Sequence, residues 1–178
     1  VDLIELQARR AGLEPGDPAK GSWLAEQIEI DPIDVAKAAH DPRWGESHKI
    51  HLLDRHIDYV HRDGHAVAVT HLITRLMTKE ATDHAGEIRI GGETIVRALR
   101  TLKLNGQVVD VDRHAGKDDL SFSALAPGDS IEQHLVEVSR PASPFGGFIR
   151  KFYFQDRNPN PKSELFVVVD KGTKVWWH

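Results

Sequence analysis

A long hairpin pattern at residues 50–77 constrains the fold of this chain more than any other feature. Two runs rich in β-branched and other apolar residues flank Asp63-Gly64, in the sequence IHLLDRHIDYVHRDGHAVAVTHLITRLM. An Asp-Gly pair between such runs is typical of a type I′ turn, because both central residues of that turn need positive φ. We therefore expect two long antiparallel strands joined by a two-residue turn.

The β pattern continues from residue 48 to the end of the chain. Turns are expected at Asn105-Gly106, Pro127-Gly128 and Lys171-Gly172, where glycine can take a positive φ. The later strands are predicted at residues 87–90, 93–104, 107–111, 129–138 and 148–155, with a last hairpin of 165–169 and 173–177. About nine short strands with no helix between them indicate a mainly β chain folded as an antiparallel β-sandwich.

Residues 1–45 differ from the rest and predict a short helical N-terminal arm. Residues 3–9 and 22–28 are compatible with short helices, and a further helix is predicted at residues 32–40. Asp31 would cap that helix, and Pro32 would fill its first position without wasting an N–H group. The chain begins at Val1 without a signal peptide, so we expect it to be part of a longer polypeptide. Its predicted organisation is an arm at 1–45 and a β-sandwich at 46–178.

Composition argues against several classes of function. The 178 residues are 40% hydrophobic and 28% charged, which is enough to bury one core. The absence of cysteine excludes disulfides, thiol nucleophiles and cysteine-based zinc sites. A net charge of −4, with lysine and arginine scattered along the chain, argues against a nucleic-acid partner. No apolar run approaches the ~18 residues of a membrane span, so none is predicted.

The 11 histidines suggest a metal-dependent enzyme or a metal-binding site on the first hairpin as one alternative. With a two-residue turn, His56 faces His71 on the paired strand, and Asp58 lies two residues away on the same face. Two imidazoles and a carboxylate are a donor set for zinc or iron. The simpler interpretation, which we favour, is a polar patch on a strand face, because a one-residue slip would separate the two histidines. We therefore predict no metal and no other cofactor, and keep His56, His71 and Asp58 as the candidates.

Motifs for catalysis are missing. The Gly-x-Ser-x-Gly and His-Glu-x-x-His patterns do not occur in the sequence. Gly91-Gly92 and Gly146-Gly147 lack the strand–turn–helix context of a phosphate-binding loop. We predict no catalytic residue and no cofactor-binding residue.

Aromatic residues leave two interpretations open. The run Phe152-Tyr153-Phe154 favours core packing, but it could also dock a neighbouring domain. A carbohydrate- or peptide-binding sandwich is a further alternative, and it would need an exposed tryptophan among Trp23, Trp44, Trp176 and Trp177.

Several segments resemble the DUF3857 family over roughly residues 50–169. The first is the opening hairpin, with Leu52-Leu53-Asp54, Tyr59-Val60, Asp63-Gly64, His71, Ile73 and Leu76. The second is the strand and turn Arg100-Thr101-Leu102-Lys103-Leu104-Asn105-Gly106, and the third is Leu125-x-Pro127-Gly128-Asp129-x-Ile131-Glu132. Residues 152–155 and 165–169 fall where later strands of the family would lie. The histidine content departs from the family pattern.

The resemblance implies an accessory role and no catalytic reaction of this chain. DUF3857 domains precede transglutaminase-like domains in bacterial proteins, often beside tetratricopeptide repeats. The resemblance therefore implies a non-catalytic accessory module that packs beside a transglutaminase/protease-like domain and could present substrate to it. It also implies an extracytoplasmic location and a catalytic partner domain beyond His178, and residues 1–12 could be the tail of a helical repeat.

Overall fold

The protein is mainly β, as its sequence predicts. The computed structural model describes residues 30–176 except 39–40, 92–93, 114–118, 140–146, 156 and 171. The arm helices predicted at residues 3–9 and 22–28, together with Trp23 and Trp177, lie outside the described residues. No helix among the described residues is long and apolar enough to cross a membrane.

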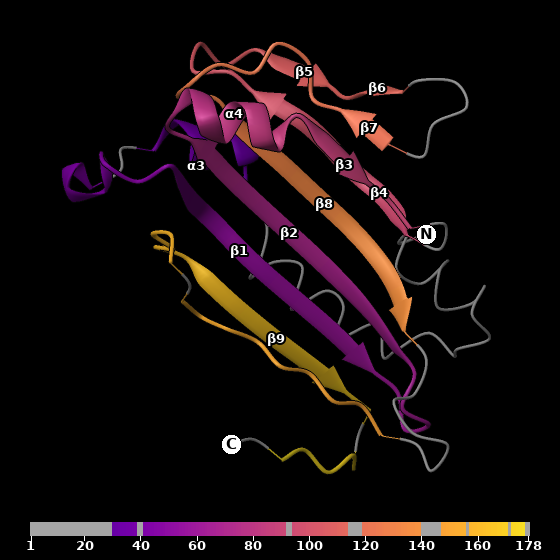
Figure 1. The fold of residues 1–178 in the computed structure, drawn as a ribbon. Helices are drawn as coiled ribbons and strands as arrows, with labels where there is room; N and C mark the ends of the chain where they lie inside the picture. The colour runs from indigo at the N-terminus through magenta and orange to yellow at the C-terminus, as the bar shows by residue number, and fades with distance from the viewer. Residues whose placement is uncertain are drawn as a thin grey trace.

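A six-stranded sheet forms the body of the molecule (Figure 1). Its strand order is β5-β4-β8-β2-β1-β9, in which β1 (Lys49–Val60) and β2 (Ala66–Leu76) are the long strands of the predicted hairpin. Its other strands are β4 (Ile95–Leu102), β5 (Val108–Asp110), β8 (Ser130–Ser139) and β9 (Ser163–Val169). Alternate side chains of the central strands pack into clusters, one of which consists of Ile57, Val67, Val69 and Val136.

The first turn differs from the prediction by one residue. His61 N–H donates to the His65 carbonyl, and Gly64 N–H donates to the His61 carbonyl, both at 2.9 Å. Gly64 has φ +86°, whereas Asp63 has no positive φ. The loop is therefore three residues long, a turn followed by one left-handed glycine, rather than a type I′ pair. Val60 pairs with Ala66 instead of Val67, and the whole strand register moves with it.

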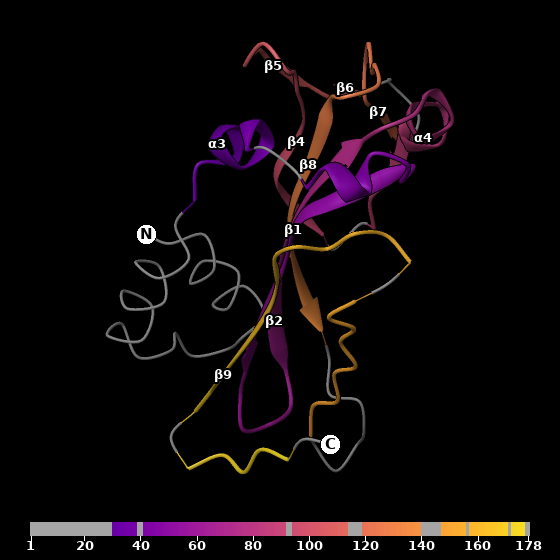
Figure 2. The same cartoon turned by 90° about the vertical axis from the view of Figure 1, so that its left-hand side faces the viewer.

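The last strand makes the six-stranded sheet mixed. β9 pairs with β1 in parallel, from Asp54↔Ser163 to Val60↔Val169, and not with residues 173–176, which form no strand. A parallel partner requires the chain to return along the sheet after β8. Residues 147–162 apart from 156, here called the crossing segment, make this return on one face (Figure 2). The strand predicted at 148–155 is wrong, because these residues belong to no sheet.

The crossing-segment face also carries the second layer. A three-stranded sheet, ordered β3-β7-β6, consists of β3 (Glu87–Arg89), β6 (Asp112–Arg113) and β7 (Asp119–Ser121). Helix α4 (Lys79–Ala85) lies beside it, so the expectation of no helix between strands is wrong. Thr78 caps α4 by accepting from Ala81 N–H at 3.2 Å. This layer packs on the large sheet through a cluster of Leu76, Ala81, Leu99, Leu120, Phe122 and Ile131.

The opposite face is covered in part by α3 (Pro32–Lys37), as Figure 2 shows. Asp31 caps this helix by accepting from Ile33 N–H at 2.8 Å, with Pro32 in the first turn, which confirms the predicted helix start. The helix ends at Lys37, earlier than predicted, and a short 3-10 helix η1 (Pro42–Trp44) follows. Ala36 of α3 packs against Ile50, Leu52, Leu53, Ile73 and Leu102.

Candidate functional site

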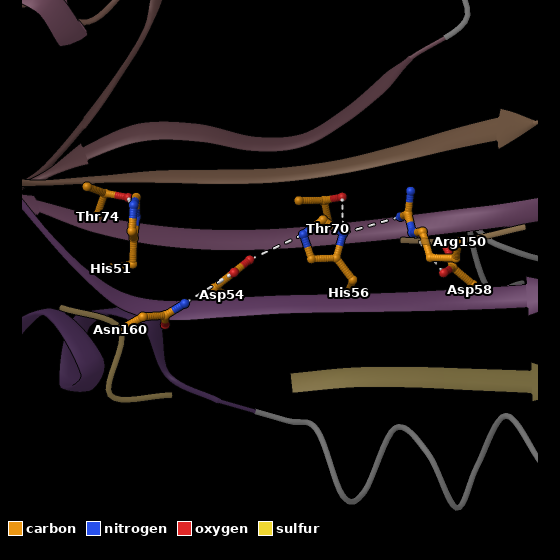
Figure 3. Close-up of polar contacts among 8 residues, drawn as sticks. All are labelled: His51, Asp54, His56, Asp58, Thr70, Thr74, Arg150 and Asn160. Carbon is orange, nitrogen blue, oxygen red and sulfur yellow. Dashed lines mark hydrogen bonds and ion pairs between the residues drawn. The ribbon is translucent and has the colours of Figure 1, made fainter. Parts of the chain in front are cut away.

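A row of polar side chains lies along β1 and β2, on the face that the crossing segment covers (Figure 3). His51, Asp54, His56 and Asp58 belong to β1. Strict alternation would put His51 and Asp54 on opposite faces, but the register shifts between His51 and Leu53. The extra residue restores both side chains to one face. The sequence therefore places four polar groups on a single sheet face by alternation and one bulge.

His56 lies at the centre of this row. Its Nε2 is 3.2 Å from Asp54 Oδ1, and its Nδ1 is 3.2 Å from Thr70 Oγ1 and 3.3 Å from Arg150 NH2. These partners assign the neutral tautomer with the proton on Nε2, because Arg150 can only donate to Nδ1. Burial lowers the pKa of His56, and Arg150 lowers it further, although the Asp54 carboxylate opposes both. His56 is therefore held as a neutral acceptor toward Arg150.

Asp58 is fully buried beneath Arg150. Arg150 Nε lies 3.0 Å from Asp58 Oδ2, as an ion pair. Apart from Arg150, no described residue donates a hydrogen bond to either carboxylate oxygen. Burial raises the pKa of Asp58, and the Arg150 charge only partly offsets this effect. The pair therefore fixes Arg150 over the sheet face while leaving the carboxylate incompletely satisfied.

The metal candidates of the sequence do not come together. His56 pairs with Thr70, and His71 pairs with Arg55, so the two imidazoles lie on opposite faces of the sheet. Asp58 stays on the His56 face. The expected opposition of His56 and His71 is wrong because the three-residue turn shifts the register by one residue. The hairpin donor set of His56, His71 and Asp58 is not formed.

His71 instead joins a charged cluster on the other face, which the sequence analysis missed. His71 Nε2 lies 2.9 Å from Glu132 Oε1, and the ring stacks on His134 with centroids 4.3 Å apart. Arg100 Nε holds the second oxygen of Glu132 at 2.5 Å. Burial alone would raise the pKa of Glu132, but hydrogen bonds from His71 and Arg100 outweigh it and lower that pKa. The sequence alone does not show that these residues are neighbours, because their contact depends on the register of β2, β4 and β8.

This cluster has donor atoms within 4.8 Å of one another, close enough to consider a metal ion. The imidazole planes differ by only 7°, so their lone pairs run side by side and do not converge on one point. Arg100 also occupies one oxygen of the carboxylate. The arrangement is better explained as a buried ion-pair network.

The face with His56 is hollowed into a groove. One hollow of about 620 Å³ is lined by Asp54 and His56 below and by Arg150, Tyr153 and Arg157 of the crossing segment. A second hollow of about 410 Å³ lies beside α4. Both hollows are lined by His51 and Leu72, so they adjoin. We call the two together the polar groove.

Exposed apolar side chains gather on the crossing segment. Ile149 is 83% exposed, Tyr153 63% and Phe154 59%. Phe152 is half-buried and anchors the segment, because its ring meets His56 edge-on at 5.1 Å and Phe154 at 4.8 Å. We call Ile149, Tyr153 and Phe154 the apolar triplet.

The two tryptophans among the described residues differ in their exposure, which a sugar-binding platform would require. Trp44 packs against the α3 cluster, whereas Trp176 is 82% exposed. Trp23 and Trp177 lie outside the described residues.

Comparisons with known proteins add little. No protein-family model matches the chain, and a comparison with curated proteins finds no match. Among solved structures, the chain is similar to a "putative protease" from Parabacteroides distasonis, with 14% identity and a TM-score of 0.43. The similarity covers 54% of this chain and 24% of that protein.

Proposed function

We propose that this chain is a non-catalytic accessory module of a larger bacterial protein. It packs beside a transglutaminase/protease-like domain of the same polypeptide, as the DUF3857 resemblance implies. The observation that supports this role is the apolar triplet, because Ile149, Tyr153 and Phe154 are all largely exposed within six residues of the crossing segment. Exposed apolar side chains that gather in one place are typical of an interaction surface.

The fold explains how such a segment is presented. Phe152 is held by its ring contacts with His56 and Phe154, and Arg150 is held by Asp58. These anchors fix the segment against the sheet while its apolar neighbours face outward. A surface that is ordered before it binds loses less conformational entropy on association, which favours a domain interface.

The test is binding in trans to the domain encoded next to this chain in its polypeptide. Isothermal titration calorimetry should detect binding with a negative heat-capacity change, the mark of apolar burial. The double variant Ile149→Ser, Phe154→Ser should weaken binding at least about tenfold, because each side chain contributes about 1.5–3 kcal/mol when buried.

Leu104→Ser is the matched control. Leu104 is 63% exposed but lies in the turn between β4 and β5, outside the crossing segment that carries the apolar triplet. The control should bind like the wild type. Absence of binding, or equal weakening by both variants, would contradict the proposal.

A further inference from the structure

The polar groove has the shape of a site for an extended chain. Its two hollows, of about 620 Å³ and 410 Å³, adjoin at His51 and Leu72. These residues belong to β1 and β2, so the groove follows the direction of the two long strands. One wall is the crossing segment, and α4 borders the other end. A ligand that fills both hollows must be long and narrow.

The charge of the groove differs between its two ends. Arg150, Lys151 and Arg157 line the larger hollow, and Asp54 supplies the one carboxylate among its described lining residues. That carboxylate is already bound by Asn160 Nδ2 at 3.3 Å and by His56. Buried Asp58 offsets the charge of Arg150, so Lys151 and Arg157 carry the excess positive charge. This concentration of positive charge occurs in a chain whose net charge is −4. It therefore favours an anionic group at this end of the groove.

The end beside α4 has a different character. Glu80 and Glu87 line it together with Lys49, and Gln133 offers an amide on its floor. No excess of positive charge is present among these residues. A ligand that fits both hollows should therefore carry carboxylates only at the end that lies in the larger hollow. It should also have groups that can form hydrogen bonds along its length.

We propose that the polar groove binds an extended peptide whose acidic side chains lie beside Lys151 and Arg157. A peptide combines both requirements, since its backbone offers donors and acceptors along the groove and its side chains supply carboxylates. Guanidinium groups pair with carboxylates through charge-assisted hydrogen bonds. This site goes beyond the proposed function, because it needs no neighbouring domain. Tyr153 belongs to both sites, but Ile149 and Phe154 do not line the groove, so the variants that test the two proposals change different residues and either proposal can fail without the other.

Fluorescence polarisation with the full chain tests this proposal. The probe is a fluorescein-labelled alanine peptide that ends in a run of glutamates, compared with the same peptide ending in glutamines. The glutamate peptide should bind at least about tenfold more tightly, the difference expected for charge-assisted contacts. Binding should also weaken as salt is added.

Arg157→Gln is the variant of choice, because it leaves the pair of Arg150 with buried Asp58 intact. It should weaken the glutamate peptide about tenfold. Arg43→Gln is the matched control, since Arg43 is exposed, lies on η1 and does not line the groove. It should change nothing.

Three results would overturn the proposal. The two peptides could bind equally, or Arg157→Gln and Arg43→Gln could weaken binding equally, which would show only general attraction between charges. A labelled polygalacturonate that binds, when the glutamate peptide does not, would show an acidic sugar to be the ligand.

Discussion

His134 is the residue whose environment most alters its chemistry. Burial lowers its pKa to about 4, and His71 and Arg97 act in the same direction, against a weaker effect of Glu132. An imidazole with a lowered folded-state pKa stays neutral in the fold while the unfolded chain takes up a proton. Its contribution to stability is therefore complete above the ordinary pKa of 6.5 and is lost as the pH falls toward about 4.

We expect the variant His134→Gln to lose this pH dependence. Between pH 7 and pH 4, the wild type should lose about 2 kcal/mol through this residue, less than the full shift implies because solvent screens a partly exposed ring. Urea unfolding at both pH values measures the difference. His84→Gln, at an exposed position of α4, is the control and should lose stability as the wild type does. An unchanged slope in His134→Gln would contradict the assignment.

The β1–β2 turn lies close to the start of the crossing segment, which is distant from it in sequence. Gly64 has φ +86°, and a Cβ atom built on it would lie 2.5 Å from the backbone nitrogen of Gly147. The turn therefore needs glycine for two reasons, its left-handed conformation and the close approach of the crossing segment. The same glycine sets the strand register and limits what can stand at the start of the crossing segment.

Gly64→Ala should destabilise the protein by about 2 kcal/mol or more, since a left-handed alanine alone costs about 1–2 kcal/mol and the contact with Gly147 adds to it. Gly86→Ala is the control. Gly86 has φ −63° at the end of α4, and its nearest neighbour to an added Cβ is 3.8 Å away. Denaturant unfolding should show it close to the wild type. If the two variants lost equal stability, the close approach would be refuted.

At the scale of the whole molecule, local patterns predicted local structure well. The Asp31-Pro32 helix start, the long strands of the first hairpin and the turn at Gly128, with φ +95°, follow from cap and turn chemistry a few residues wide. The register of the first hairpin could not be predicted in this way, because Asp-Gly fits both a two-residue and a three-residue turn. That single residue decided whether His56 met His71, and so it decided the candidate site.

Long-range pairing was beyond the reach of those patterns. Residues 163–169 have the apolar character of a strand, but nothing in them says whether the partner is the next segment or β1, which ends more than a hundred positions earlier in the chain. The polar groove depends on that pairing, because the crossing segment is the connection that brings β9 beside β1. The groove residues Arg150 and Asn160 were therefore missed, whereas Asp54 and His56 could be placed on one face from the hairpin alone.

The absence of native cysteine allows the parallel pairing of β9 to be tested directly. Val60 and Val169 are register partners at one end of the β1–β9 pair, and Ser163 stands at the other end of β9. Neighbouring strands bring paired Cα atoms to about 5 Å, within the range of a disulfide, whereas six residues along a strand span about 20 Å. A Val60→Cys, Val169→Cys variant should therefore oxidise to an intramolecular disulfide, and Val60→Cys, Ser163→Cys should not.

Thiol titration and non-reducing electrophoresis score both variants. The closed loop is long, so the disulfide should also raise the free energy of unfolding by about 2–4 kcal/mol, most of it lost on reduction. An antiparallel β9 would reverse the result, because Ser163 would then lie beside Val60. That outcome would also remove the reason for the crossing segment to lie over His56, and with it the polar groove.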